Sequence, residues 1–396
     1  LRFHDLNQLL ADPAQARAAL DGVDCVVSNV GPHAHYYFRL REQLGARFRI
    51  VRDVRTAIWS SYLLQEHLCA PLLREHDVLL AASAYTRTLY RHLYPHLQQH
   101  PIRRCYPLTV GFPSQRLPRP VRDGGPTVLG YLGRLSEDKN LPDLVELLIR
   151  LNEAEPGGYR LLACGDVHSE SCQPARIHAR LVERLGRSDL FEHLPARPNA
   201  EIWAVLARMD VLVFPSTSNL ETLGRVLIEA SYAGVPVVCG AHAAAPELVP
   251  AEALVAVAYR YDTVFDAHHD HSLGRTSVDG LLLAILERRY RTSDCHDDYR
   301  RHDGRFLGIV RDPSADDDGD GPDTQPLHTS PRAFIQALQV QRPGPLDKSQ
   351  ALQQIDALTH WFLTLQRRGS AARAQALADL QRLSAFPERK IGRAHV

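Results

Sequence analysis

The stretch from position 210 to position 247 most constrains the fold that this chain can adopt. It begins with a short apolar run at 211–214 that a proline closes, which predicts a strand buried on both faces. After a polar loop, apolar residues recur at helical spacing from Thr222 until Gly234, where the helix is expected to end. A second apolar run, at 235–238, predicts another strand. Strand, loop, helix and strand in this order form one parallel unit of a doubly wound α/β sheet.

Two carboxylates stand out in this unit, Glu221 where the loop enters the helix and Glu229 about two turns further on. They are eight positions apart in the sequence, which is roughly 12 Å along a helix axis. The backbone N–H groups of Leu223 and Gly224 belong to the first turn of the predicted helix, where they have no partner within the helix. Because Gly224 has no side chain, a phosphate can approach these donors closely. On spacing alone, two ordinary helix-surface glutamates are an equal alternative.

The helix and its flanks contain a motif, ETLGRVLIE followed by ASYAGVPVV, that closely resembles the E-x7-E signature of the family 4 retaining glycosyltransferases. The resemblance implies the GT-B fold, in which two Rossmann-like domains enclose an active site in the cleft between them. It also implies that Glu221 lies at the donor sugar and that Glu229 hydrogen-bonds the nucleotide ribose. The amides of Leu223 and Gly224 would then hold the distal phosphate. Enzymes of this fold generally need no metal. We therefore expect a nucleotide sugar as co-substrate, without a metal or a cofactor.

A second motif with the same resemblance is the segment GRLSEDKN at 133–140. The apolar run at 127–132 predicts a strand before it, and Gly133 allows a tight turn at the end of that strand. Arg134 and Lys139 place two cations in this loop, where a diphosphate needs charge-assisted contacts. The segment matches the G-R-L-x-x-x-K loop of the family, whose arginine and lysine bind the donor diphosphate. The resemblance therefore implies catalytic roles for Arg134, Lys139 and Glu221, and donor binding by Gly133 and by Asp166 at the end of the next predicted strand.

The amino-terminal part of the chain also alternates between predicted helices and strands, with strands at 24–30, 47–54 and 77–83. In the family, polar residues at such strand ends face the cleft. Four residues are therefore candidates for contacts with the acceptor or the sugar: His33, His35, Asp53 and Arg55. Solvated or capping histidines are the alternative interpretation of His33 and His35. Many relatives carry a histidine near the end of the second of these strands, and this chain has none there.

Length and composition indicate two domains of an ordinary globular protein. The chain has 396 residues, of which 44% are hydrophobic and 23% charged. We expect an amino-terminal Rossmann-like domain at 1–112 with an incomplete start, a linker at 113–126, a nucleotide-sugar-binding Rossmann-like domain at 127–260, an irregular elaboration with an acidic loop at 261–345, carboxyl-terminal helices at 346–390, and a tail at 391–396 derived from a sequencing adapter. Two aspartate-containing segments, 266–271 and 316–321, are interpreted as polar loops rather than metal sites.

Cysteine usage and charge balance indicate the compartment and the partners. Seven cysteines are scattered without a C-x-x-C pair, which favours reduced thiols in a cytoplasmic protein. The 46 basic and 46 acidic residues balance, which gives no reason to expect nucleic acid as a partner. No apolar run approaches the roughly 20 residues that span a bilayer. Any membrane association is therefore expected to be peripheral, at the inner face of the membrane.

Together these features predict a retaining glycosyltransferase that moves a sugar from a nucleoside-diphosphate sugar to an acceptor bound by the amino-terminal domain. The acceptor is expected to be a glycan, a lipid-linked glycan or a small molecule, with polysaccharide biosynthesis as the setting that the family suggests. Two alternatives stay open. One is a GT-B relative with other chemistry, such as a nucleotide-sugar epimerase or a glycan phosphorylase, and the other is a GT-B scaffold that binds sugar or protein without catalysis.

Overall fold

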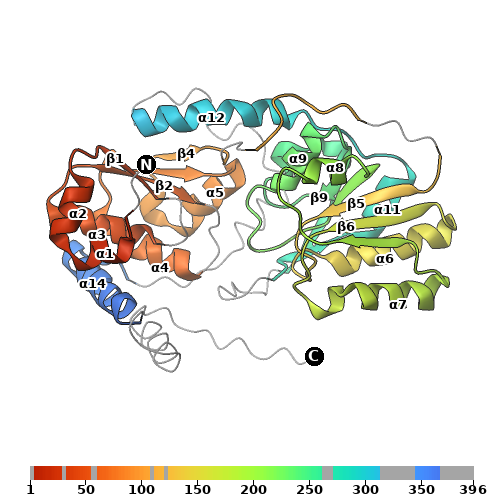
Figure 1. Cartoon of the computed structure of the whole chain (residues 1–396), viewed down its shortest axis with the longest axis horizontal. Coiled ribbons are helices and arrows are strands. Elements are labelled where there is room, and N and C mark those ends of the chain that lie inside the picture. Colours follow the sequence, from red (N-terminus) through yellow and green to blue (C-terminus); the bar gives the residue numbers. More distant parts are fainter. Residues whose placement is uncertain are drawn as a thin grey trace.

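The computed structural model describes residues 4–28, 33–54, 60–107, 111–119, 124–260, 271–312 and 344–365. These residues form two α/β domains that lie side by side, each built on a parallel sheet (Figure 1). The predicted α/β class is thereby confirmed, and the two sheets fall on either side of the predicted linker.

The amino-terminal domain contains a four-stranded parallel sheet in the order β1-β2-β3-β4. Side chains of β3 are buried on both faces, as its apolar run predicts. Helix α5 begins at Ala84 because the Ser83 hydroxyl caps it and accepts a hydrogen bond from the Thr86 amide at 3.0 Å. The elements of this domain are α1 (Leu6–Ala11), α2 (Pro13–Leu20), β1 (Cys25–Ser28), α3 (Ala34–Leu44), β2 (Arg49–Val54), α4 (Ser60–Cys69), β3 (Val78–Ala81), α5 (Ala84–Leu93) and β4 (Ile102–Arg104).

The second domain is built on a six-stranded parallel sheet in the order β10-β9-β8-β5-β6-β7. The chain adds strands on one side of β5 and then returns to its other side with β8, so the winding direction reverses between β5 and β8. Ligands of such doubly wound sheets bind beside the carboxyl ends of the strands at this switch point. The elements are β5 (Thr127–Leu132), α6 (Leu141–Ala154), β6 (Tyr159–Cys164), α7 (Pro174–Leu185), β7 (Phe191–Leu194), α8 (Ile202–Leu206), β8 (Val211–Phe214), α9 (Arg225–Tyr232), β9 (Val237–Gly240), α10 (Ala245–Leu248) and β10 (Leu254–Val255).

Two hydrophobic clusters cover the two faces of the second sheet. Alternate residues along each central strand enter different clusters, since successive side chains of a strand point to opposite faces. Leu161 and Val213 belong to the cluster beneath α6 and α7, whereas Leu162 and Leu212 belong to the cluster that contains α9. The strands are therefore buried on both sides, and polar side chains can gather only at the ends of the strands.

Residues 271–312 are not the irregular elaboration that the sequence suggests. They contain β12 (Gly274–Thr276), which pairs antiparallel with β11 (Val257–Tyr259), and the helices α11 (Val278–Leu286) and α12 (Cys295–Arg311). Helix α11 packs on α6 and inserts Leu281 into the core of the second domain. No helix was predicted at 278–286, although this run is mostly apolar, because it lies between polar segments. Residues 266–270 and 316–321 lie outside the described residues.

Two helices from the carboxyl-terminal part of the chain contact the amino-terminal domain. In Figure 1, helix α12 lies along the first domain, and one of its ends reaches α9 of the second domain. Near its start, Nδ1 of His296 is 2.8 Å from the Ser231 hydroxyl on α9, and near its end the Arg49 guanidinium donates to the Ile309 carbonyl at 2.8 Å. Helix α14 (Lys348–Leu365) packs on α3 and α4 and buries Ile355 in the core of the first domain. Both helices therefore connect the carboxyl-terminal part of the chain to the amino-terminal domain.

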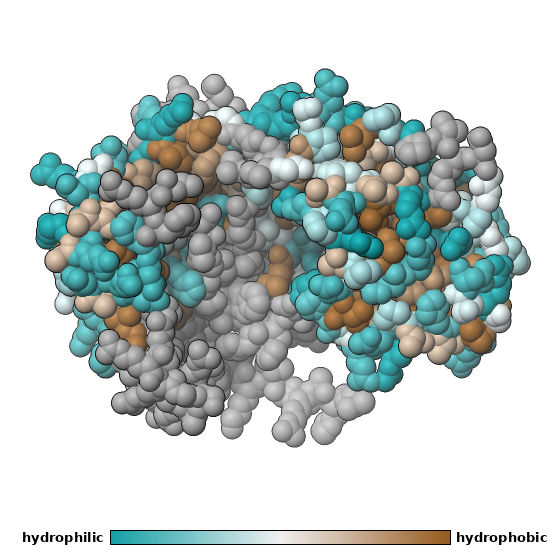
Figure 2. Space-filling view, in the orientation of Figure 1, coloured by the Kyte–Doolittle hydropathy of each residue, from teal (hydrophilic) through white to brown (hydrophobic). Residues whose placement is uncertain are grey.

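Where residues are coloured in Figure 2, the visible face is mainly hydrophilic, with hydrophobic residues in small separate groups. Three large hydrophobic side chains are exposed among the described residues, and they lie on three different helices: Val182, Leu283 and Leu307. Within the described ranges, no helix has both the length and the apolar character needed to cross a membrane.

Candidate active site

The loops that follow β5, β6 and β8 meet at the carboxyl edge of the second sheet, beside the switch point. Gly133 and Gly165 approach each other there, with φ angles of +146° and +151°. A Cβ atom on Gly165 would lie 1.9 Å from the Gly133 carbonyl oxygen, which leaves no room for a side chain. The Gly133 amide donates to the Cys164 carbonyl at 2.9 Å. The close approach therefore continues the hydrogen-bond ladder between β5 and β6 by one residue. The resulting backbone turn presents no side chain to a ligand at this point.

Arg134 extends from the loop after β5 and is held by neighbours in the same loop. Its Nη2 pairs with Oδ2 of Asp138 at 3.0 Å, and the Ser136 hydroxyl donates to the other oxygen of that buried carboxylate at 2.5 Å. The Tyr131 hydroxyl donates to the Arg134 carbonyl at 2.5 Å. Because 32% of the Arg134 side chain is exposed, the guanidinium stays accessible to an anion. The predicted donor residue Asp166 is exposed nearby, and its Oδ1 accepts from the Ala196 amide at 3.3 Å.

Lys139 and Glu221 form an ion pair that joins the two sequence motifs. Lys139 Nζ lies 2.7 Å from Glu221 Oε2, and both side chains are mostly buried, with 16% and 13% exposed. The Ser216 hydroxyl donates to the same oxygen at 3.3 Å. Burial alone would raise the pKa of Glu221, but the attraction of Lys139 outweighs it and holds the pKa below its ordinary value. The carboxylate is therefore ionised at neutral pH, as a group that stabilises positive charge must be.

Asn140 reinforces this junction, and the sequence interpretation missed it. Its side-chain amide donates to the Pro215 carbonyl at 2.9 Å and to the Thr217 hydroxyl at 2.8 Å, which fastens the loop after β5 to the loop after β8. Asn140 has a φ of +57°, a conformation that asparagine adopts more readily than most residues. The only signal in the sequence was an asparagine directly before the predicted helix at 141–151.

The helix of the E-x7-E motif begins at Arg225 rather than at Thr222 as predicted. Gly224 takes a left-handed conformation with φ +72°, which interrupts the helix at that point. Its amide, predicted to be unpartnered, donates to Glu221 Oε1 at 3.0 Å. Leu223 has its side chain buried in the core of the second domain. The prediction is thus corrected for Gly224, because the carboxylate of Glu221 itself accepts the hydrogen bond of that amide.

Glu229 lies on α9 with only 7% of the residue exposed. Its Oε1 is 3.1 Å from Nε of Arg225, one turn earlier, and the Arg225 guanidinium lies 4.8 Å from the centre of the Phe112 ring. Burial raises the pKa of Glu229, and the charge of Arg225 only partly offsets this effect. A buried carboxylate with a single cation beside it is a good acceptor for hydroxyl groups of a ligand.

Three of the four predicted acceptor-side residues are among the described residues, and these three lie in the first domain. His33 is exposed just before α3 and makes no side-chain cap, whereas His35 is buried beside Tyr36 with ring centres 4.2 Å apart. Burial, with a smaller contribution from His33, lowers the pKa of His35 to about 3, so His35 is neutral at physiological pH. Asp53 is half-buried in β2, and Arg55 lies outside the described residues. The ring contacts of the two histidines are with α3 and not with the donor loops.

Contacts across the domain boundary add residues that sequence reasoning did not assign to the site. Glu247, on α10, accepts hydrogen bonds from the amides of Ala84 and Tyr85 at the start of α5, at 2.9 and 2.8 Å. The Ser83 hydroxyl donates to the Thr222 carbonyl at 2.7 Å, directly beside Glu221. The first turn of α5 is therefore fastened to the donor loops of the second domain. In the sequence, Ser83 was only the last residue of the strand predicted at 77–83.

His242 contacts the same loop from β9. Its Nε2 lies 3.1 Å from the Ser218 carbonyl oxygen, and its Nδ1 lies 3.1 Å from the Tyr259 hydroxyl. Burial lowers the pKa of His242 to about 4, so the imidazole is neutral at physiological pH. With both nitrogens engaged, His242 supports the loop that carries Glu221.

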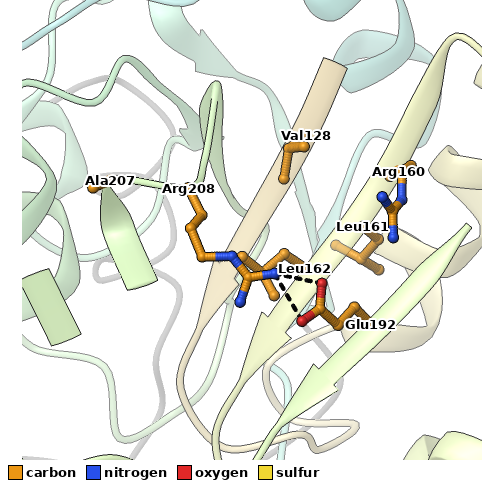
Figure 3. Close-up of a pocket in the computed structure, with 7 residues that line it drawn as sticks. All are labelled: Val128, Arg160, Leu161, Leu162, Glu192, Ala207 and Arg208. Carbon is orange, nitrogen blue, oxygen red and sulfur yellow. Dashed lines mark hydrogen bonds and ion pairs between the residues drawn. The ribbon is translucent and has the colours of Figure 1, made fainter. Parts of the chain in front are cut away.

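One pocket lies away from this site, at the amino-terminal half of the strands. It has a volume of ≈ 370 Å³ and is crossed by the Arg208–Glu192 ion pair, in which Nη2 lies 2.7 and 2.6 Å from the two carboxylate oxygens (Figure 3). The residues that line it are Val128, Arg160, Leu161, Leu162, Glu192, Ala207 and Arg208. Because ligands of a doubly wound sheet bind at the opposite edge, this pocket is not the candidate site.

Two parallel-sheet α/β domains, the second of them doubly wound, define the GT-B class, and solved structures confirm that the chain has this fold. The pneumococcal O-GlcNAc transferase GtfA in complex with UDP and GlcNAc is similar with a TM-score of 0.53 and 14% identity, over 77% of this chain and 60% of that chain. Anabaena Alr3699/HepE in complex with UDP is similar with a TM-score of 0.52 and 15% identity, over 76% of this chain and 79% of that one. At such identities the likeness concerns the fold alone.

Sequence similarity is concentrated in the second domain. Residues 116–263 match the family model described as Glycosyl transferases group 1, and this range contains both motifs. A D-inositol 3-phosphate glycosyltransferase of Segniliparus rotundus is 34% identical over 116 residues, which are 29% of this chain and 25% of that protein. The chain thus matches about a quarter of that relative's length. The resemblance to glycosyltransferases is confirmed at this level.

Proposed function

We propose that the protein is a retaining glycosyltransferase of the family 4 type that uses a nucleoside-diphosphate sugar as donor. The observation that carries the proposal is the Lys139–Glu221 ion pair, since it joins the G-R-L-x-x-x-K loop to the E-x7-E loop at the carboxyl edge of the sheet. The match of residues 116–263 to a glycosyltransferase family supports it.

Transfer breaks the bond between the anomeric carbon and the diphosphate oxygen and forms a bond to an acceptor hydroxyl oxygen, whose proton passes to the departing diphosphate. Negative charge grows on the departing nucleoside diphosphate, and preorganised cations lower the energy of that state. Arg134 and Lys139 are the cations of the site, and each is paired with a carboxylate, Asp138 and Glu221. A bound diphosphate competes for both cations and frees the Glu221 carboxylate to turn toward the sugar.

Glu221 and Glu229 have different tasks in this proposal. Glu221, ionised and freed from Lys139, faces the anomeric carbon as positive charge develops there. Glu229, buried one helical turn beyond Arg225, accepts hydrogen bonds from the ribose. Gly133 and Gly165 let the diphosphate approach the backbone, and Asp166 borders the nucleotide side. Retention of configuration is proposed from the motif resemblance.

The acceptor is proposed to be a glycan, a lipid-linked glycan or a small molecule that the first domain binds. A cytoplasmic location is proposed on the cysteine chemistry, and peripheral contact with the membrane is proposed from the family resemblance. All seven cysteines lie within the described residues, and none of them forms a disulfide bond there.

The test is turnover of a panel of nucleotide sugars, UDP-glucose, UDP-galactose, GDP-mannose and ADP-glucose, with simple sugars or water as acceptor. Proton NMR of the product reports the anomeric configuration directly. We expect the enzyme to consume one of these α-configured donors and to give an α-configured product. Glu221→Gln and Lys139→Met are expected to lose this turnover. An inverted product would contradict the retaining assignment. Donor binding without any turnover would favour the scaffold alternative, and a donor converted to its epimer without transfer would favour an epimerase.

A further inference from the structure

Tyr85, in the first turn of α5, carries a buried hydroxyl for which the structure offers no partner. The residue is 1% exposed, and its hydroxyl oxygen makes no hydrogen bond with any described residue. A buried hydroxyl that has lost its water without gaining a partner destabilises the fold, whereas phenylalanine would fill the same space without that loss. The hydroxyl therefore calls for an explanation other than stability.

The position of Tyr85 is fixed by contacts that cross the domain boundary. Its own amide donates to Glu247 Oε1 at 2.8 Å, and the amide before it donates to Oε2. Two residues earlier, the Ser83 hydroxyl donates to the Thr222 carbonyl at 2.7 Å. The first domain thus places Tyr85 against the donor loop of the second domain, and the residue next to Thr222 in that loop is Glu221.

The surroundings of the Tyr85 side chain belong to the candidate site. Its ring lies 6.1 Å from the His242 ring, whose two nitrogens are already engaged with Ser218 and Tyr259. Burial raises the pKa of Tyr85, and the Glu221 carboxylate raises it further. Tyr85 therefore keeps its proton at neutral pH and is available as a hydrogen-bond donor close to Glu221.

We propose that the Tyr85 hydroxyl donates a hydrogen bond to a hydroxyl group of the sugar that binds beside Glu221. Tyr85 is then a specificity-determining contact that the first domain contributes to the sugar site beside Glu221. The inference rests on the proposed function, because it takes the ligand at Glu221 to be a sugar. The shared chemistry is a sugar hydroxyl, which belongs either to the donor sugar or to an acceptor sugar beside it.

The test compares wild type with Tyr85→Phe by calorimetric titration. Loss of one hydrogen bond is expected to weaken binding of the sugar about fivefold to tenfold. If the donor sugar is the ligand, the affinity for UDP-glucose, GDP-mannose or ADP-glucose falls while the affinity for the matching nucleotide stays unchanged. If an acceptor sugar is the ligand, free glucose, mannose or galactose binds more weakly to the protein saturated with nucleotide, and the nucleotide-sugar affinity stays unchanged. Unchanged affinities in both arms would overturn the proposal.

A second measurement needs no ligand. Without a partner for the hydroxyl, Tyr85→Phe is expected to raise the melting temperature of the free protein by about 2–4 °C. A lowered melting temperature would show that the hydroxyl has a partner within the chain and would overturn the inference, whatever the ligand. Tyr159→Phe is the matched control, since Tyr159 is buried at the far end of β6 and its hydroxyl bonds to Glu155. It is expected to lower the melting temperature and leave sugar affinity unchanged.

This pair of measurements separates the two proposals. A wild-type protein that binds no nucleotide would contradict the proposed function, while the melting temperatures would still report on Tyr85. If the wild type binds nucleotide sugars and Tyr85→Phe behaves identically in both arms, the proposed function stays intact and Tyr85 is removed from the site.

Discussion

The contact of Glu247 with α5 gives a sharp test of how the two domains are joined. One carboxylate accepts two backbone hydrogen bonds from the first turn of the helix, at 2.9 and 2.8 Å. Hydrogen bonds to a charged group contribute about 1.5–3 kcal/mol each, and negative charge at a helix start adds to this stabilisation. Glu247 also forms a longer ion pair with Arg104, at 3.9 Å.

Replacing Glu247 by alanine removes both hydrogen bonds and leaves two partly buried amides without an acceptor. We expect Glu247→Ala to destabilise the joined state by about 3–5 kcal/mol, and Glu247→Gln, which keeps one acceptor oxygen, by about half as much. Hydrogen exchange of the Ala84 and Tyr85 amides measures this directly. A change of about 3 kcal/mol corresponds to exchange faster by on the order of 100-fold.

Ser277→Ala is the matched control for the Glu247 variants. Ser277 caps α11 by accepting from the Gly280 amide at 3.0 Å, and it lies within the second domain. Its loss is expected to cost about 1 kcal/mol in urea unfolding without changing exchange at α5. If Glu247→Ala exchanged its Ala84 and Tyr85 amides at the wild-type rate, the reasoning that Glu247 fastens the domains would be refuted.

Two further predictions concern stability. Burial would raise the pKa of Glu66, but the buried Arg52 outweighs it, and together with His96 lowers the pKa to about 2. Because the folded pKa lies below the unfolded value of about 4.5, this pair stabilises the protein fully above pH 4.5. About 3 kcal/mol is then lost as the pH falls toward 2, a loss that acid titration of Glu66→Gln would lack. Gly165→Ala is expected to lower the free energy of unfolding by several kcal/mol in thermal melting, because the added Cβ would lie 1.9 Å from the Gly133 carbonyl oxygen. Gly186→Ala is the control: its Cβ would have open space, and the only cost is the strain of alanine at a φ of +68°. Equal costs at the two glycines would contradict the close approach of β5 and β6.

Local patterns were enough to predict the second domain. Its strands are short apolar runs, so the α/β class follows directly from the sequence. The glycine, arginine and lysine of the first loop lie within seven positions, and their donor-binding role is what the family resemblance implies. The start of α9 was placed three residues too early because helical spacing continues through Thr222 and Leu223. What interrupts the helix is the left-handed Gly224, whose amide is held by a carboxylate that the same pattern had assigned to a ligand.

Contacts between distant parts of the chain could not be predicted in this way. Glu247 and the start of α5 are more than 160 positions apart, and neither segment contains a sequence pattern that indicates contact with the other. The same holds for α12, whose two ends contact different domains. His35 was predicted as a candidate for contact with the acceptor or the sugar, and it lies buried in the first domain beside Tyr36. Burial of a single histidine depends on packing that its sequence neighbours do not reveal, and its contact with a ligand stays a prediction.

The central claim is that the loops after β5, β6 and β8 bind the nucleoside diphosphate of a sugar donor. Calorimetric titration of UDP, GDP and ADP tests it most directly, with Arg134→Ala and Glu229→Ala beside the wild type. Arg150→Ala is the control, since Arg150 is equally exposed but forms a surface ion pair with Asp279 on α11. We expect saturable binding of one nucleotide to the wild type and to Arg150→Ala, and loss of that binding in both site variants. A folded wild type that binds none of the three, or site variants that bind as tightly as the control, would contradict the claim.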